Sequence, residues 1–200
     1  MCVDEGSIMH RNDLNDQTEG SIEWMAEQLL SSLEAWGRTS EHHREDTPRR
    51  FVAALRQLTE REEFNFTTFP STGDEMVTLG PIPFYTLCAH HIVPFYGRAW
   101  VSYVPSNRVA GLSKFARAVK YVAKGFWVQE ELVQELADYL EAKLAPKGLG
   151  VVMEAEHMCM AMRGVETAGV LTTTAAMRGV YADHSKTAKA EFMSIIQQTR

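Results

Sequence analysis

Residues 111–146, GLSKFARAVKYVAKGFWVQEELVQELADYLEAKLAP, decide the fold because they read as two consecutive helices. In the second helix, leucines recur every four residues, a spacing typical of a buried helical face. Gly125 separates the two helices, and Pro146 ends the second one. Strand patterns lie on both sides of this helical pair, at 74–80 and 98–105 before it and at 149–158 and 170–180 after it.

The order ββααββ predicts an α+β domain in which an antiparallel four-stranded sheet carries two helices on one face. We expect this unit to cover residues 74–200, with residues 187–198 forming a closing helix. The other face and the edges of such a sheet need cover, and oligomerisation is one usual solution.

Two further helices are predicted ahead of the sheet, as a helical N-terminal layer over residues 21–60. Apolar residues fall at helical spacing over 21–36, and the stretch DTPRRFVAAL at 46–55 has the signals of a second helix start. Residues 1–20 are polar and lack periodicity, so we expect a flexible tail there. The sequence therefore predicts a single domain over residues 21–200.

The composition excludes several classes of partner. The chain has 200 residues, 45% of them hydrophobic, and a net charge of -6 at pH 7. This negative field repels nucleic acid and anionic membranes, so an anionic ligand needs a local basic cluster. No apolar run approaches the roughly 20 residues of a membrane span, and the start of the chain lacks signal-peptide features. Cys2, Cys88 and Cys159 are too few for a disulfide framework, so we expect a cytoplasmic protein.

The stretch LCAHHIVPFYG contains a candidate metal-binding motif. Cys88 and His91 can face one ion from a tight turn, whereas His90 should point elsewhere. Cys159, in EAEHMCMAMRG, would complete a set of three ligands. A zinc site with three protein ligands keeps a position open for water, as catalytic sites do, and it would leave His90 and His157 as proton donors and acceptors.

Both halves of this set also have a structural interpretation. Two adjacent histidines are more often a loop feature than a site. Cys159 lies among methionines in MCMAM, where it could be a buried core thiol. Spacing cannot pair it with a motif so far upstream, and the residues alone leave both interpretations open.

Four motifs, in their order and intervals, resemble GTP cyclohydrolase I, the zinc enzyme that opens pterin biosynthesis. They are LCAHHIVPFYG, GLSKFARAV, VQEEL and EAEHMCMAMRGV. The similarity runs from about Ser21 to the C-terminus and includes DTPRR and the Thr-rich LTTTAAMRG. It implies the T-fold, or tunnelling fold, which agrees with the ββααββ order. It also implies a homodecamer of two pentamers, with active sites at the subunit junctions.

The resemblance assigns roles to individual residues. It makes Cys88, His91 and Cys159 the zinc ligands, and it makes His90 and His157 the acid and base groups. No other cofactor is implied.

The resemblance also implies how GTP is bound. Glu130 falls where the family recognises guanine, and one carboxylate can accept from both N1–H and the 2-amino group. Gln129 stands beside it in the same recognition motif. The resemblance matches five residues to the triphosphate: Arg50, Ser113, Lys114, Arg117 and Arg163. Four of them are basic, as binding of an anionic ligand to this acidic chain requires.

The implied reaction is the zinc-dependent hydrolysis and rearrangement of GTP to 7,8-dihydroneopterin triphosphate, with release of formate. Water adds to C8 of guanine, a histidine protonates N7, and the imidazole ring opens to a formamide. A second hydrolysis releases formate, and the ribose then rearranges before the new ring closes. The product could feed folate, another pterin or a deazapurine, and the sequence does not choose among them.

Three departures from the family pattern leave alternatives open. Ala89 stands where the family usually has glutamate, Gly125-Phe126-Trp127 replaces a basic and polar segment, and Val170 replaces a serine. The chain could therefore only open the guanine ring, or bind GTP as a poorly active regulatory module. A T-fold nitrile reductase of deazapurine metabolism is a third alternative, although that enzyme needs a nucleophilic cysteine in a different motif.

Overall fold

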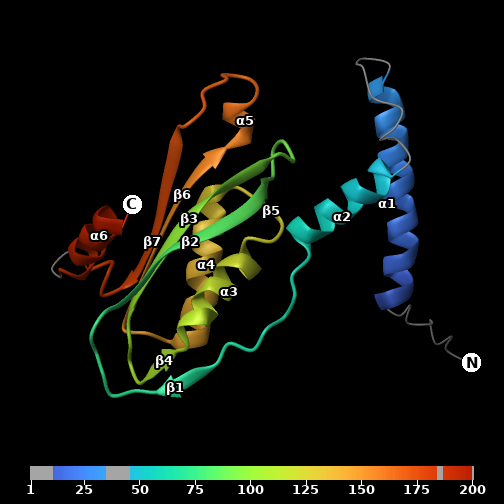
Figure 1. Ribbon diagram of the computed structural model, residues 1–200. Helices are drawn as coiled ribbons and strands as arrows, with labels where there is room; N and C mark the ends of the chain where they lie inside the picture. The colour runs from blue at the N-terminus through green and yellow to red at the C-terminus, as the bar shows by residue number, and fades with distance from the viewer. Residues whose placement is uncertain (1–10, 35–45, 184–186, 200) are drawn as a thin grey trace, which may run out of the picture. The chain divides into compact units, whose positions relative to one another are not determined.

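The computed structural model describes residues 11–34, 46–183 and 187–199. The chain divides into two compact units, Met1–Gln57 and Leu58–Arg200. Figure 1 shows the described elements, coloured from the N-terminus to the C-terminus. The second unit contains the sheet and every residue of the candidate site described below except one arginine.

An antiparallel sheet forms the centre of the second unit. Strands β2 (Val77–Cys88), β3 (Pro94–Val104), β6 (Gly148–His157) and β7 (Leu171–Gly179) lie side by side in that order. Each neighbouring pair is antiparallel, and β3 pairs with β6 along its whole length except Pro94. The predicted α+β fold with its ββααββ order is confirmed.

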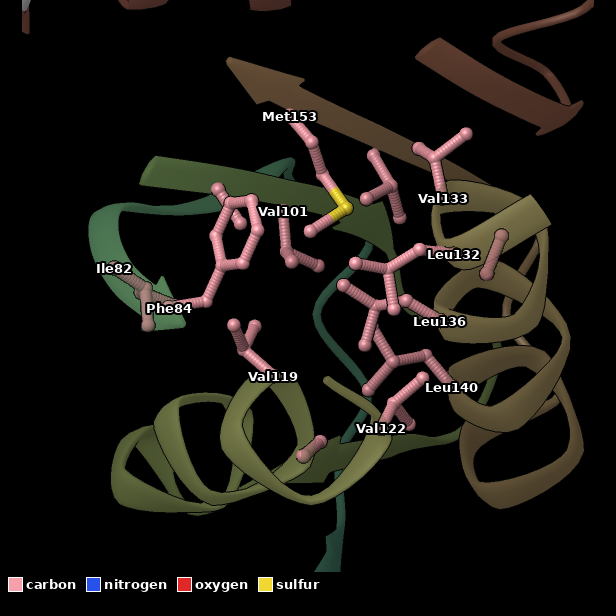
Figure 2. Close-up of a cluster of buried hydrophobic side chains, with 14 of the residues drawn as sticks. Ile82, Phe84, Val101, Val119, Val122, Leu132, Val133, Leu136, Leu140 and Met153 are labelled. Carbon is pink, nitrogen blue, oxygen red and sulfur yellow. The ribbon is translucent and has the colours of Figure 1, made fainter. Parts of the chain in front are cut away.

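Helices α3 (Leu112–Val122) and α4 (Gln129–Leu144) cover one face of this sheet (Figure 1). Leu132, Leu136 and Leu140 belong to the predicted leucine stripe, and each is at most 1% exposed in the main core (Figure 2). Burial of one such side chain contributes about 1.5–3 kcal/mol. The stripe therefore fixes α4, and with it the first turn of that helix, against one end of the sheet.

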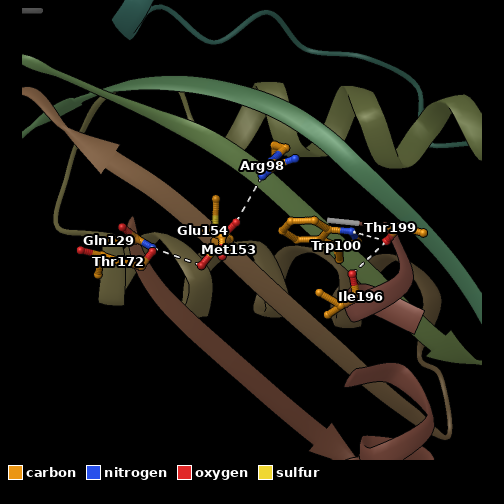
Figure 3. A network of polar contacts seen from close by, with 8 residues as sticks. All are labelled: Arg98, Trp100, Gln129, Met153, Glu154, Thr172, Ile196 and Thr199. Atoms are coloured by element: carbon orange, nitrogen blue, oxygen red, sulfur yellow. Dashed lines mark hydrogen bonds and ion pairs between the residues drawn. The ribbon is translucent and has the colours of Figure 1, made fainter. Parts of the chain in front are cut away.

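Helix α6 (Ala188–Thr199) packs on the opposite face, where the sequence predicted a closing helix. The indole Nε1 of Trp100 donates to Thr199 Oγ1 at 3.1 Å (Figure 3). Farther along the sheet, Arg98 lies 3.4 Å from the buried carboxylate of Glu154. The smaller core under α6 consists of Trp100, Val152, Tyr181, Phe192 and Ile196.

Four short elements were not predicted from the sequence. Strands β1 (Thr68–Pro70) and β4 (Arg108–Ala110) form a separate antiparallel pair. Strand β5 (Phe126–Trp127) pairs in parallel with the last two residues of β2. Helix α5 (Met158–Ala161) is a single turn directly after β6. The last two of these elements position the candidate site.

The N-terminal boundary differs from the prediction. Helix α1 (Arg11–Glu34) begins ten residues earlier than Ser21, so residues 11–20, expected in the flexible tail, are helical. Residues 1–10 of that tail lie outside the described residues. Helix α2 (Thr47–Thr59) starts where DTPRR predicted. Among the described residues, no helix is both long and apolar enough to cross a membrane.

Candidate metal centre and active site

The turn after β2 gathers the first two candidate ligands. Cys88 ends the strand, and its carbonyl accepts from the amides of His91 and Ile92 at 3.3 and 2.9 Å. Ile92 has φ 55°, a left-handed conformation that a branched side chain rarely adopts. This tight turn brings Cys88 Sγ and His91 Nδ1 to 3.7 Å from each other.

The third candidate ligand arrives from a distant part of the chain. Strand β6 pairs with β3 up to the partners Phe95 and His157, and α5 begins at the next residue. This places Cys159 beside the turn, so that the donor atoms of Cys88, His91 and Cys159 all lie within 4.8 Å of one another. The structure thus brings together the set that spacing alone could not pair.

This donor set fits a soft or borderline divalent metal. Two thiolates and an imidazole are preferred zinc ligands, and the ligand atoms of a tetrahedral zinc site lie about 3.5–3.8 Å apart given the usual bond lengths. Burial and the neighbouring Cys88 raise the pKa of Cys159, whereas the positive charge of Arg163 lowers it. A bound cation would favour deprotonation of the Cys159 thiol, which is the usual coupling between metal binding and ligand deprotonation.

His157 lies at the end of β6 in a fixed orientation. Its ring stacks on Phe95, with centroids 4.5 Å apart and planes inclined by 7°. Its Nε2 is 2.7 Å from Gln129 Oε1. Burial lowers the pKa of His157, and the nearby carboxylate of Glu130 opposes that shift. This imidazole is therefore held by contacts from two other elements, close to the predicted guanine carboxylate.

His90 has a different setting from His157. It is exposed in the turn after β2, and its ring centroid lies 6.1 Å from that of His91 at a steep angle. The planes of the two neighbouring imidazoles are therefore nearly perpendicular. Ala89 donates its backbone N–H to the Trp127 carbonyl at 3.0 Å, which joins the turn to β5 and to the start of α4.

Glu130 and Gln129 form the first turn of α4, but their surroundings differ. Glu130 is exposed, whereas Gln129 is 1% exposed. The amide of Gln129 is hydrogen-bonded to the carbonyls of Met153 and Thr172, on β6 and β7 (Figure 3). It also contacts Thr174 Oγ1 and His157. The Gln129 amide is thus engaged within the protein, while an exposed Glu130 is available to a ligand.

The predicted phosphate-binding residues are mostly exposed. Ser113 and Arg117 of α3 and Arg163 after α5 are exposed, and Lys114 is half-buried. The ion pairs found in the described part of the chain do not involve Lys114, Arg117 or Arg163. Arg50 belongs to the first unit, where it pairs with Asp46 at 2.9 Å.

The family model for GTP cyclohydrolase I matches residues 24–197. The chain belongs to the GTP cyclohydrolase I family. The predicted family, its T-fold and its enzyme class, the hydrolases, are confirmed.

Named members of the GTP cyclohydrolase I family match most of the chain. A protein of Deinococcus radiodurans named GTP cyclohydrolase 1 is 45% identical over 76% of this chain and 73% of its own length. A GTP cyclohydrolase 1 of Aquifex aeolicus is 43% identical over 76% of this chain and 83% of its own length. One of Chlorobium phaeovibrioides is 38% identical over 98% of this chain and 90% of its own length. A solved apo structure of the archaeosine synthase QueF-Like aligns at TM-score 0.43 and 18% identity, over 55% of this chain and 96% of that one, too weak a likeness to bear on function.

Proposed function

We propose that this protein converts GTP into 7,8-dihydroneopterin triphosphate and formate, using zinc held by Cys88, His91 and Cys159. The observation that carries the proposal is the convergence of these three donor groups within 4.8 Å, in a chain of the GTP cyclohydrolase I family that keeps His157 two residues from a ligand. When bound, zinc supplies a Lewis acid that makes water a nucleophile near neutral pH.

The guanine base is recognised by Glu130. Its carboxylate accepts from N1–H and from the 2-amino group, a pair of donors that adenine lacks. Because the N-terminal turn of α4 is fixed by the leucine stripe behind it, this acceptor is presented at a defined place beside His157. Adenine nucleotides are excluded since they would leave the carboxylate without its partners, a penalty of about 1–3 kcal/mol or more.

The two histidines move protons during ring opening. As water adds to C8 and the imidazole ring of guanine breaks, a proton must reach N7, and the second hydrolysis needs another to release formate. His90 is adjacent to His91 in the chain and His157 is two residues from Cys159, which suits both histidines to these transfers. The ribose rearrangement that follows is internal to the substrate and needs no redox cofactor.

The triphosphate is held by Ser113, Lys114, Arg117 and Arg163. Lys114, Arg117 and Arg163 have no carboxylate partner among the described residues, so they are suited to bind phosphate oxygens. Their positive charges offset the repulsion that a net charge of -6 exerts on an anionic substrate. Arg50 remains a phosphate ligand on the basis of its motif. These contacts orient the substrate and remain at a distance from the reacting carbon.

The active oligomer is a homodecamer of two pentamers, with active sites at the subunit junctions. Two open sheet edges support this assembly. The outer edge of β7 has no strand partner within the described ranges, and β2 pairs with β5 through Leu87 and Cys88 alone. Joining one edge to the other in successive subunits would satisfy both. Free thiols at the ligand positions need a reducing compartment, which supports a cytoplasmic location.

A product analysis tests the proposed function. The purified zinc-loaded protein is incubated with GTP, and the products are followed by mass spectrometry, pterin absorbance and a formate assay. We expect one formate and one dihydroneopterin triphosphate for each GTP consumed. Accumulation of a formamide species would identify a ring-opening hydrolase, and binding of GTP without any product would identify a regulatory module. Either result would refute the proposal.

A further inference from the structure

The side-chain amide of Gln129 can be oriented in only one way. Its Nε2 lies 2.9 Å from the carbonyl oxygen of Thr172, 3.3 Å from that of Met153 and 3.2 Å from Thr174 Oγ1. Carbonyl oxygens only accept hydrogen bonds, so the nitrogen of the amide must face them. A reversed amide would lose both bonds and set its oxygen against two others in a site that is 1% exposed.

The amide orientation determines which nitrogen of His157 carries a hydrogen. With Nε2 of Gln129 facing the strands, its Oε1 faces His157 Nε2 at 2.7 Å. An amide oxygen only accepts, so the imidazole Nε2 must donate. The stack on Phe95 holds the plane of the ring, and a flip of the ring within that plane would replace Nε2 by a carbon and lose the hydrogen bond to Gln129.

We infer that Gln129 is a positioning residue that fixes His157 in the tautomer protonated at Nε2, so that Nδ1 is the nitrogen that exchanges protons. The backbone of β6 and β7 is the reference for this arrangement, because two of its carbonyls orient the amide. Gln129 transmits that orientation from the sheet to the imidazole. This positioning role differs from the substrate contact that the sequence motif predicts for Gln129.

The catalytic consequence rests on the proposed function, in which His157 moves protons to and from the substrate. A neutral ring protonated at Nε2 has one lone pair, at Nδ1. A change of tautomer, in which the proton leaves Nε2 and Nδ1 becomes protonated, would turn this acceptor into a donor without moving the ring. Loss of the Gln129 amide should therefore slow proton transfer. Binding of GTP should be nearly unchanged, because it relies on Glu130 and on the proposed triphosphate-binding residues.

Nitrogen NMR of the ring tests the tautomer directly. The zinc-loaded protein is labelled with ¹⁵N-histidine and examined in the solid state, at a pH where the ring is neutral, and the His157 signals are those lost in His157→Gln. We expect a protonated Nε2 and an unprotonated Nδ1 in the unaltered protein. A protonated Nδ1 with a bare Nε2 would overturn the inference, and this result needs no variant of Gln129.

The variant Gln129→Met keeps the length of the side chain and removes its hydrogen bonds. We expect a mixture of tautomers, a kcat for GTP lower by about 10- to 100-fold, as for other groups that orient a catalytic histidine, and a KM within about twofold. Gln134→Met makes the same change on α4 at a glutamine that accepts from Arg178, and it should alter neither the tautomer nor kcat. Thr174→Val leaves both carbonyls in place and should leave the tautomer unchanged.

Two outcomes separate failure of this inference from failure of the proposed function. An unchanged tautomer in Gln129→Met, or a raised KM with an unchanged kcat, would show that Gln129 does not position His157. A protein that makes no formate from GTP but shows the Nε2–H tautomer, lost in Gln129→Met, would refute the proposed reaction and leave the positioning role standing.

Discussion

Two regions supply the candidate active site, and they are built in different ways. The turn after β2 carries Cys88, His90 and His91 within four residues and is closed by its own backbone hydrogen bonds. The end of β6 carries His157, which is positioned by pairing with β3 and by contacts from Phe95 and α4, and Cys159 follows two residues later in α5. The first region is closed mainly by local hydrogen bonds, with one further bond from Ala89 to Trp127 of β5, whereas the second depends on tertiary structure throughout.

The two regions therefore differ in what positions their functional groups: backbone hydrogen bonds hold the ligands of the turn, whereas side chains of other elements hold His157. A turn closed mainly by local bonds presents two ligands with few contacts from other elements, here the pairing with β5. A histidine that must keep one tautomer needs partners that come from other elements, here Phe95 of β3 and Gln129 of α4. Substitutions in the two regions should therefore fail in distinguishable ways.

The largest effect is expected from Cys159→Ala, which removes the ligand that joins the two regions. Zinc should fall from about one ion per chain to nearly none. Activity should fall by on the order of 10⁴-fold or more, because the metal is expected to contribute at least as much to the rate as the acid–base groups, which contribute about 10²–10⁴-fold. Metal analysis of the purified variant checks this. Cys2→Ala removes a thiol elsewhere in the sequence and should retain zinc and activity. Full turnover by metal-free protein would rule out the proposed metal chemistry.

Replacing His90 or His157 should have similar effects on activity but different effects on the free energy of unfolding of the protein. His90→Ala and His157→Ala should each lower kcat by about 10²–10⁴-fold. His157→Ala should also lower the free energy of unfolding by about 1–3 kcal/mol, since it leaves the buried Gln129 oxygen without a donor and Phe95 without its stacked ring. His90→Ala, at an exposed position, should stay within about 0.5 kcal/mol of the original protein. Equal stability losses in denaturant titrations would contradict the distinction.

A smaller effect is expected from Lys114, one of the proposed triphosphate-binding residues, which lies on α3 outside both regions. Lys114→Ala should raise the KM for GTP by about 10- to 100-fold, the loss of one hydrogen bond to a charged group, and leave any use of guanosine unchanged. Lys120→Ala alters the same helix at an exposed lysine of its last turn and serves as the control. Steady-state kinetics with both substrates decide the matter, and equal losses for GTP and guanosine would show that Lys114 does not bind phosphate.

The smallest effect is expected from Ala89→Glu, which restores the residue usual in the family within the local turn. A carboxylate there can orient a neighbouring group without itself touching the substrate, and such an interaction changes the rate by about 10-fold. We expect the same product at a changed rate, with Ala89→Gln as an uncharged control of similar size. Mass spectrometry compares the products, and a pterin made only by the glutamate variant would mean that the protein with Ala89 stops at an earlier intermediate.

The sequence predicted the parts of the site that depend on short spacing and periodicity. The leucine stripe fixed the position of α4, and the Cys-x-x-His spacing identified the turn. The α+β order followed from the strand patterns around 111–146. The short β5 and α5 escaped prediction because two to four residues are too few to show a period.

The role of Gln129 could not be predicted, because it depends on where two strands place their carbonyls. A polar residue ahead of a glutamate at a helix start reads as exposed, and its burial becomes visible only when β6 and β7 lie against it. The signal that could have helped is the Thr-rich run of β7, since Thr174 offers a hydroxyl to a buried amide. The stack of His157 on Phe95 likewise needs the β3–β6 register.

X-ray absorption at the zinc edge tests most directly whether the two regions meet at one metal. The purified zinc-loaded protein should give two sulfur neighbours at about 2.3 Å, with lighter nitrogen or oxygen neighbours at about 2.0 Å. Cys88→Ala and Cys159→Ala should each reduce the sulfur contribution or abolish binding. A zinc ion surrounded only by nitrogen and oxygen, or by one sulfur in the unaltered protein, would contradict the three-ligand centre.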